Sequence, residues 1–322
     1  MKVGVIGTGA MGKNHARIYA GMKNVQLVGV ADVDQKTGKS VAASHGCRYY
    51  RDYEDLLEKE KPDAVSVCVP TAYHYRVAKD VIAKGVNLLI EKPITKTLED
   101  AEELVSLAKK AGVKLAVGHI ERFNPAVQQL KALIDKGALG DITSIMARRV
   151  GLFPPRIKDA NVIIDIGVHD IDVFNYLLGK EPTSIFSCAG KALIKDREDY
   201  ADIFLKYNGT NGIIQVNWIT PVKIRVLNVT GTKGYAELNY ITQDLVLYES
   251  IYKKTYDEFG DFVVLFGEPK KRHIAVKKQE PLKLELEDFI GAVRSGREPL
   301  VTGEDGVRVL RTAVEIINAC RR

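Results

Sequence analysis

The chain has 322 residues, about the size of two domains, and its 46% hydrophobic and 27% charged residues are typical of a folded globular protein rather than a disordered one. Its 47 basic and 41 acidic residues give a formal net charge of +6 that is spread along the chain, which argues against a nucleic-acid partner. No apolar run reaches the roughly 18 residues that cross a bilayer, so no membrane partner is expected.

The first 120 residues alternate regularly between predicted strands and predicted helices. The strands are expected at 2–6, 25–31, 48–50, 64–69, 86–90 and 114–117, and the helices at 11–22, 35–45, 53–59, 73–84 and 97–110. Most of these strands are continuous apolar runs, which are typical of a parallel sheet with helices on both faces. The alternation with short connections therefore predicts a doubly wound α/β domain.

After residue 120 the pattern changes to helices at each end of a strand-rich region. Helices are expected at 125–136, 161–178, 284–293 and 306–320, and a strand at 142–150. Between 184 and 248 several strands are separated by the turn signals Asn208-Gly209, Asn211-Gly212 and Gly231-Thr232-Lys233-Gly234. Such hairpin connections indicate an antiparallel sheet.

We therefore expect two domains. Residues 1–120 form a nucleotide-binding Rossmann domain, and residues 121–322 form an α+β domain for substrate binding and oligomerisation, with a large, open, mainly antiparallel sheet. The C-terminal helix is expected to be able to pack back on the first domain.

The first strand is followed directly by the glycine-rich loop Gly7-Thr8-Gly9-Ala10-Met11-Gly12, which opens the first helix. The first glycine permits a tight turn, the second lets the backbone approach a pyrophosphate, and the third lets the helix pack on the strand. The helix N-terminus then faces the phosphates. The motif alone could be a tight turn without a ligand, but its place between a strand and a helix favours dinucleotide binding.

Asp32 ends the second strand, twenty positions after Gly12. A carboxylate at this place can accept both hydroxyls of an adenosine ribose, and it would repel a 2′-phosphate. No arginine follows it directly, and Lys36 is the nearest cation. The sequence therefore favours NAD over NADP.

Two further segments carry side chains that could act on a substrate. Glu91-Lys92-Pro93 lies at the carboxyl end of a predicted strand, the edge at which open α/β sheets bind ligands. Asp165-Ile166-Gly167-Val168-His169 places a carboxylate and an imidazole four residues apart, on one face of a helix. Taken singly, the first could be an exposed ion pair, and the second a helix-terminal acid with a core histidine.

Together these segments resemble one known family, the oxidoreductases grouped with glucose–fructose oxidoreductase and inositol dehydrogenase. The resemblance covers essentially the whole chain. It rests on the glycine loop, Val69-Pro70-Thr71 with His74, Glu91-Lys92-Pro93, Gly118-His119 with Arg122 and Asn124, and Asp165-x-Gly167-x-His169-x-x-Asp172. Each piece alone is unspecific, but the set in this order is specific.

The resemblance implies that Lys92, Asp165 and His169 form the catalytic group, and that the Lys92–Pro93 peptide bond is cis. With the glycine loop and Asp32, it gives a cofactor-binding set of Gly7, Thr8, Gly9, Ala10, Met11, Gly12, Asp32, Val69, Pro70, Thr71, His74, Glu91, Lys92, His119 and Asn124. The expected cofactor is NAD.

The implied reaction is reversible oxidation of a secondary alcohol of a sugar to a ketone, with hydride transfer to nicotinamide. His169 suits the role of the base that takes the hydroxyl proton. Lys92 would bond the same oxygen and stabilise developing alkoxide charge, and Asp165 would orient His169 or a substrate hydroxyl. Because Lys92 belongs to the first domain and His169 to the second, they are expected to meet in the cleft between the domains.

A closer resemblance concerns the substrate. Residues 146–157, 215–221 and 231–238 are similar to dehydrogenases that act on nucleotide-linked amino sugars, with the UDP-N-acetylglucosamine 3-dehydrogenases nearest. This implies oxidation of UDP-N-acetylglucosamine at C3. The alternatives are an inositol, polyol or free-sugar dehydrogenase and, from another class, a non-catalytic NAD-binding regulator, against which the presence of both Lys92 and His169 argues.

Five cations lie in predicted substrate-domain segments and could pair with a substrate diphosphate: Arg148, Arg149, Arg156, Lys223 and Arg225. For any single one of them, ordinary sheet-surface charge is the favoured interpretation. We take Arg149 and Arg156, with Asp165 and His169, as the candidate substrate residues.

The remaining signals concern metal, compartment and assembly. The four cysteines are scattered and form no Cys-x-x-Cys pair, so we expect neither a disulfide framework nor a zinc site, and a reducing cytoplasm fits. Met1-Lys2 leads straight into a strand, so no signal peptide is expected. The basic cluster Lys270-Lys271-Arg272 is interpreted as a solvated loop. The sheet has more strands than the helices can cover, which predicts a homodimer or a two-fold symmetric homotetramer.

Overall fold

The structure is a computed structural model that describes residues 1–152, 160–256 and 262–320. It divides into two compact units. The first consists of Met1–Ile120 with Glu280–Arg311, and the second of Glu121–Gln279 with Thr312–Arg322. The first segment ends where the sequence predicted a boundary, but the expected second domain, 121–322, is interrupted, because Glu280–Arg311 groups with the first unit.

The first unit is built on a six-stranded parallel sheet, which confirms the expected doubly wound fold. Its strand order is β3-β2-β1-β4-β5-β6. The strands are β1 (Lys2–Ile6), β2 (Gln26–Ala31), β3 (Arg48–Tyr50), β4 (Ala64–Val67), β5 (Asn87–Glu91) and β6 (Leu115–Gly118). The order reverses between β1 and β4, and the carboxyl ends of strands beside such a reversal are where dinucleotides bind in this fold.

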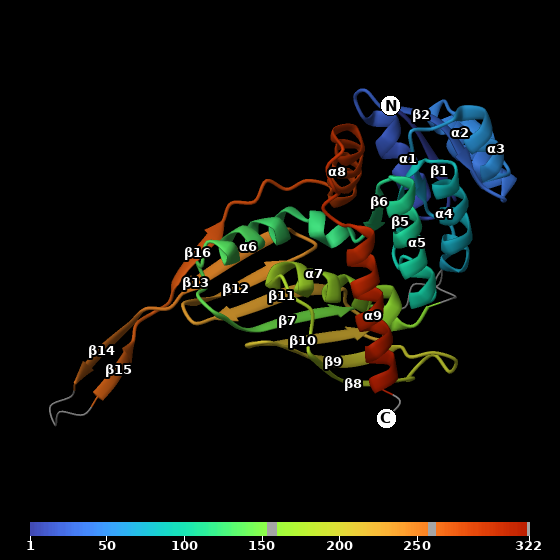
Figure 1. Ribbon diagram of the computed structural model, residues 1–322. Helices are drawn as coiled ribbons and strands as arrows, with labels where there is room; N and C mark the ends of the chain where they lie inside the picture. The colour runs from blue at the N-terminus through green and yellow to red at the C-terminus, as the bar shows by residue number, and fades with distance from the viewer. Residues whose placement is uncertain (153–159, 257–261, 321–322) are drawn as a thin grey trace. The chain divides into compact units, whose positions relative to one another are not determined.

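Helices pack around this sheet (Figure 1). They are α1 (Gly12–Gly21), α2 (Gln35–His45), α3 (Tyr53–Glu60), α4 (His74–Ala83), α5 (Leu98–Ala111), α8 (Pro281–Ser295) and the first part of α9 (Gly303–Ala319). Local signals begin and end several of them: Thr97 caps α5 by accepting a hydrogen bond from the Asp100 amide, and Gly112 ends it in the left-handed conformation.

The apolar side of α8 explains why a late segment of the chain belongs to the first unit. Leu286 and Phe289 are buried in the same cluster as Val3, Val30 and other residues of β1, β2 and α1. Burying a large apolar side chain contributes about 1.5–3 kcal/mol, so this contact fixes α8 on the parallel sheet.

The second unit contains an eight-stranded sheet of order β16-β13-β12-β11-β7-β10-β9-β8. β7 and β10 pair in parallel and the other neighbours are antiparallel. The strands are β7 (Ile142–Val150), β8 (Ser184–Gly190), β9 (Tyr200–Tyr207), β10 (Thr210–Asn217), β11 (Ile224–Gly231), β12 (Gly234–Asn239), β13 (Asp244–Glu249) and β16 (Lys270–Ile274). A separate hairpin pairs β14 (Tyr252–Tyr256) with β15 (Phe262–Phe266).

Two helices, α6 (Pro125–Asp135) and α7 (Val168–Leu178), lie across one face of this sheet (Figure 1). Burial alternates strictly along β9, so one side of the strand is in the core and the other is exposed. The sheet is therefore open on one face, as the sequence predicted. No helix among the described residues is both long and apolar enough to span a membrane.

Three local expectations were wrong. Asn211-Gly212 lies inside β10 and makes no turn. A Cβ on Gly212 would lie 3.0 Å from the Phe174 ring, so this glycine admits a close packing contact. The expected helix 161–178 includes a π-helical segment, Ile163–Gly167, before α7. The basic cluster 270–272 lies in strand β16, where exposed charges are typical of a sheet edge.

Candidate active site

The three glycines of the loop after β1 meet the three requirements of a dinucleotide-binding turn. Gly7 has φ of 86°, and a Cβ there would lie 2.7 Å from the backbone of Cys68. A Cβ on Gly12 would lie 1.8 Å from the Gly7 carbonyl oxygen, so α1 can start here only with glycine. Gly9 is exposed with nothing within 4 Å of a Cβ, which leaves its backbone open to a pyrophosphate. The loop therefore fits NAD.

Asp32 is held close to the glycine loop by its own hydrogen bonds. Its Oδ2 accepts from the Thr8 amide at 2.6 Å and from Thr8 Oγ1 at 2.7 Å, and its Oδ1 accepts from the Asp34 amide at 2.9 Å. A carboxylate offers about four lone-pair sites, so one on Oδ1 is left for a ribose hydroxyl.

The ends of β4 and β5 are connected by His74, a buried residue at the start of α4. Its Nδ1 lies 2.8 Å from the Pro93 carbonyl oxygen, and its Nε2 lies 2.9 Å from that of Val69. Burial lowers the pKa of His74, so the ring is neutral near pH 7, and its single N–H can donate to only one of these two carbonyl oxygens. The Lys92–Pro93 bond is cis, as the resemblance implied. His74 thus donates a hydrogen bond to one of the Val69 and Pro93 carbonyl oxygens and packs against the other.

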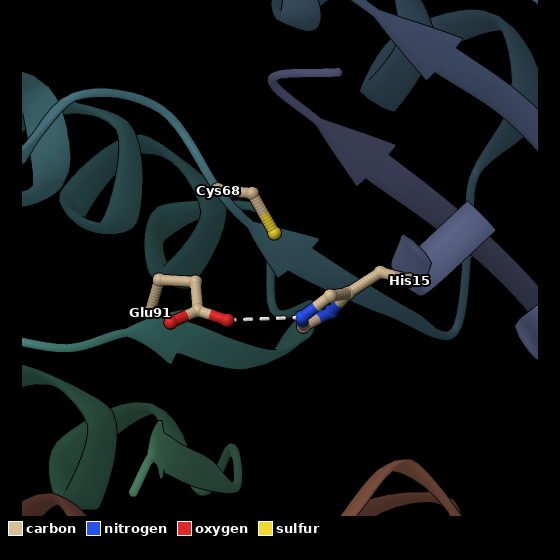
Figure 2. Close-up of side chains that lie close together, drawn as sticks. All are labelled: His15, Cys68 and Glu91. Atoms are coloured by element: carbon tan, nitrogen blue, oxygen red, sulfur yellow. Dashed lines mark hydrogen bonds and ion pairs between the residues drawn. The ribbon is translucent and has the colours of Figure 1, made fainter. Parts of the chain in front are cut away.

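Glu91 is the end of a buried hydrogen-bonded chain that the sequence did not indicate, and Figure 2 shows its last step, from His15 to Glu91. His15 Nε2 lies 3.0 Å from Glu91 Oε1, and His15 Nδ1 lies 3.0 Å from Ser66 Oγ, which lies 2.8 Å from the Tyr19 hydroxyl. An ionised carboxylate only accepts, so His15 Nε2 donates to it. Ser66 Oγ therefore connects His15 Nδ1 with the Tyr19 hydroxyl.

This chain keeps Glu91 ionised and in one position. Burial opposes its charge, but the hydrogen bond from His15 and the positive charge of Lys92 leave the pKa of Glu91 below its usual value. The carboxylate also accepts from the Lys92 amide, and it packs so closely on Gly118 that a Cβ there would lie 3.1 Å from Glu91 Oε2. Glu91 is thus a buried support for the Lys92 backbone and not an exposed ion pair.

Cys68 lies beside this pair (Figure 2), and the possible ligand atoms of His15, Cys68 and Glu91 all lie within 4.8 Å of one another. Thiolate, imidazole and carboxylate are zinc ligands, but only the deprotonated thiol binds metal. Burial raises the pKa of the Cys68 thiol well above its usual value. His15 and Glu91 also bond one another, so the contacts favour a hydrogen-bonded network over a metal site.

In the second unit, Asp165 and His169 lie at the beginning of α7, and both are half-buried. Asn161 starts the segment: its Oδ1 accepts from the Ile164 amide at 3.0 Å, and its carbonyl oxygen accepts from the Asp165 amide at 2.9 Å. Asp165 is part of the π-helical turn, and His169 follows in the first turn of α7. Such single π-turns are frequent at functional sites.

Two expected site residues have other roles in the structure. Arg149 is only 2% exposed, and its guanidinium donates to both oxygens of Asp170 and to Glu121. Asn124 caps α6 by accepting from the Ala126 amide, and its own amide donates to the Tyr240 carbonyl oxygen. Neither side chain can reach a ligand without leaving a buried partner unsatisfied, so we interpret both as structural.

The remaining expected residues are placed as follows. Arg122 and Asp172, which belong to the resembled pattern, form a buried ion pair with Nε 2.9 Å from both carboxylate oxygens. Thr8 and His119 are buried; Met11, Val69, Thr71 and Lys92 are half-buried; and Ala10 and Pro70 are exposed. Arg156 lies outside the described residues.

The parallel sheet, its glycine loop and the acid at the end of β2 define a dinucleotide-binding oxidoreductase. Residues 1–119 match the family model described as "Oxidoreductase family, NAD-binding Rossmann fold", and residues 127–237 match the GFO/IDH/MocA C-terminal domain. The chain belongs to the GFO/IDH/MocA oxidoreductase family, and it is an NAD(P)-dependent dehydrogenase acting on CH–OH groups.

Individual relatives match over nearly the full length. The chain is 33% identical over 319 residues to UDP-N-acetylglucosamine 3-dehydrogenase of Acidithiobacillus ferrooxidans, covering 98% of this chain and 96% of the relative. The solved structure of that enzyme superposes with a TM-score of 0.87, covering 99% of this chain and 97% of that chain. The NAD-dependent scyllo-inositol 2-dehydrogenase of Bacillus subtilis is 28% identical over 336 residues, covering 100% of this chain and 94% of the relative.

Proposed function

We propose that the protein oxidises the C3 hydroxyl of UDP-N-acetylglucosamine to a ketone, with NAD as the oxidant. The main support for this substrate is the 33% identity, over 98% of the chain, to an enzyme that bears that name. Inositol dehydrogenases are also related: the scyllo-inositol 2-dehydrogenase of Bacillus subtilis is 28% identical over the full chain. The proposed substrate therefore rests on the likeness to one relative, whereas the class of reaction follows from membership of the family.

The proposed chemistry uses side chains from both units. When bound, NAD supplies the acceptor for the hydride that leaves the carbinol carbon. His169 takes the hydroxyl proton as general base, and Lys92 donates a hydrogen bond to the same oxygen and stabilises its developing negative charge. The C–H electron pair leaves as hydride and the O–H proton leaves to His169, so the product is the ketone. Asp165 orients His169 or a substrate hydroxyl.

We also propose NAD in preference to NADP. Asp32 is half-buried and held against the glycine loop, so a 2′-phosphate would face a carboxylate fixed in place. The open lone pair on its Oδ1 fits a ribose hydroxyl.

The test is a substrate panel with NAD: UDP-N-acetylglucosamine, free N-acetylglucosamine, and myo- and scyllo-inositol, with NADH formation measured for each. We expect turnover with the nucleotide sugar and little with the others. Turnover with an inositol instead would overturn the proposed substrate and leave the family reaction intact. Binding of NADH without turnover of any substrate would favour the alternative that the protein is a non-catalytic NAD-binding regulator.

The roles of Lys92 and His169 are tested in the same assay. Lys92→Ala and His169→Ala should each lower turnover about 10²- to 10⁴-fold and leave NAD affinity almost unchanged. The double variant should lose far less than the product of the two losses, because the residues act on one hydroxyl. If His169 is a core residue only, His169→Ala will melt at a lower temperature while its folded fraction keeps wild-type activity.

A further inference from the structure

Three arginines of the second unit lie on or beside the helix-covered side of its sheet, and two of them are neutralised. Arg149 is paired with Asp170 and Glu121, and Arg122 with Asp172. The third is Arg225 on β11. Within residues 1–152, 160–256 and 262–320, no carboxylate lies within ion-pair distance of Arg225 and no side chain accepts a hydrogen bond from it.

The register of the sheet fixes which way Arg225 points. Arg225 lies directly opposite Arg149 in the antiparallel pair of β11 and β7. Residues directly opposite one another in such a pair project from the same face. Arg149 projects toward α7, where it bonds Asp170. Arg225 therefore projects to the same covered face, the face that carries Asp165, and its charge interacts with that of Asp165.

A half-buried cation without a partner is costly, because it loses water and gains no acceptor. The contrast with Arg149 is direct. Burial also opposes the charge of Arg149, but its ion pairs with Asp170 and Glu121 raise its pKa. For Arg225, burial and the positive charge of Arg149 lower the pKa by more than the charges of Asp170, Glu121 and Asp165 raise it. Among the residues that the structure describes, none accepts a hydrogen bond from the guanidinium of Arg225, whose donors suit a planar bidentate contact with an anion.

We propose that Arg225 binds a phosphate of the nucleotide part of the substrate, and that it is the residue that makes the enzyme prefer a nucleotide-linked sugar over a neutral one. This inference rests on the proposed function. An inositol or a free sugar has no anionic group to offer Arg225, whereas the diphosphate of a nucleoside-diphosphate sugar has several. The guanidinium lies on the face that carries Asp165, so the phosphate would bind in the same unit as Asp165 and His169.

The experiment compares Arg225→Gln with the matched control Arg148→Gln. Arg148 precedes Arg149 on β7, is exposed, and pairs with Val226, so it projects from the opposite face. The substrates form a series: UDP-N-acetylglucosamine, N-acetylglucosamine 1-phosphate and N-acetylglucosamine. For Arg225→Gln we expect KM to rise about 10- to 100-fold for UDP-N-acetylglucosamine, with a smaller change in kcat and no change for the free sugar.

Arg225→Lys should recover only part of the loss, because an ammonium keeps the charge but not the bidentate contact. A second readout does not depend on turnover: UDP binding, measured by calorimetry with the NAD complex, should weaken by a similar factor in Arg225→Gln and not in Arg148→Gln. Thermal melts of both variants check that they are folded.

Two failures are distinguishable. If the wild type oxidises UDP-N-acetylglucosamine and Arg225→Gln retains its KM and its UDP affinity, the role of Arg225 is overturned and the proposed substrate stands. If the wild type oxidises a neutral polyol and not the nucleotide sugar, the proposed substrate is overturned, and the role of Arg225 with it.

Discussion

The carboxylate of Asp32 has a structural role in the loop besides the cofactor contact that we propose for it. It takes three hydrogen bonds from the backbone and side chain of its neighbours, so it is fixed before a ribose arrives. A carboxylate that is already fixed distinguishes a ribose hydroxyl from a 2′-phosphate better than a mobile one, because no side-chain freedom is lost when the cofactor binds. Substitutions at Asp32 and at Thr8 can separate the effect of the Asp32 charge on cofactor choice from its effect on the loop.

We predict that Asp32→Ala will weaken NAD binding and strengthen NADP binding, so that the ratio of their dissociation constants falls at least about tenfold. Thr8→Ala is the matched control, because it removes a hydrogen bond to Asp32 but keeps the charge. Titrating both cofactors into wild type and variants by fluorescence gives the ratio. If wild type prefers NADP, or if Thr8→Ala changes the ratio as much as Asp32→Ala, the charge of Asp32 does not set the preference.

At the scale of elements, the carboxyl edge of the parallel sheet depends on two histidines that tie strand ends to helices. His15 of α1 holds the end of β5 through Glu91, and His74 of α4 lies between the carbonyl oxygens that follow β4 and β5 and donates its single N–H to one of them. Strand ends without such contacts would be free to move, and the Lys92 segment lies between these two. The histidines therefore stabilise the edge that presents Lys92.

The lowered pKa of His74 predicts how stability depends on pH. In the unfolded chain this histidine is protonated below about pH 6.5, whereas in the fold it stays neutral to a lower pH. The unfolded state then binds more protons, so the stability contributed by neutral His74 is complete above about 6.5 and is lost as pH falls, by at most about 1.4 kcal/mol per pH unit. Urea unfolding of the wild type between pH 7.5 and 5.5 should show this loss.

His74→Gln removes the titrating group and keeps a donor for one carbonyl oxygen. It should be less stable than wild type at pH 7.5, and its stability should fall less steeply with decreasing pH. Equal slopes for the two proteins would mean that His74 does not change its protonation on unfolding.

At the scale of the whole molecule, the open face of the eight-stranded sheet is too apolar to face water alone. A row of four apolar residues crosses it, because Phe186 pairs with Phe204, Phe204 with Ile213, and Ile213 with Met146. Phe186 is 64% exposed, Phe204 37% and Met146 45%, and the two rings lie 6.4 Å apart. A contiguous exposed apolar patch of this kind marks an interaction site.

We predict that this face joins copies of the chain in a dimer or a two-fold symmetric tetramer. Light scattering at micromolar concentration should give the mass of two or four chains for wild type, and a smaller assembly for Phe204→Glu, because a buried unpaired charge opposes association. Leu193→Glu is the control, since Leu193 is 68% exposed outside this row. A monomeric wild type, or a Phe204→Glu variant that assembles as wild type does, contradicts the prediction.

The sequence by itself determined the parallel sheet, the glycine loop with Asp32 and the family. These depend on local regularities: continuous apolar strands, glycines whose lack of a side chain is required by neighbouring backbone, and residues at fixed spacing. It also identified the hairpin at Asn208-Gly209, where Gly209 has φ of 82°. It misplaced a turn at Asn211-Gly212, because a glycine needed for space and one needed for a turn look alike in sequence.

Only the tertiary structure decided which polar residues are partners and which are left for a ligand. Arg149 and Arg225 are both strand arginines in the sequence, yet one faces Asp170 and Glu121 and the other faces no carboxylate within ion-pair distance among the described residues. His15 and Glu91 are 76 positions apart and meet because α1 packs on the sheet beside β4, the strand next to β5. Long-range pairs like these are set by how elements pack, and the period of a helix or strand carries no information about a partner in another element.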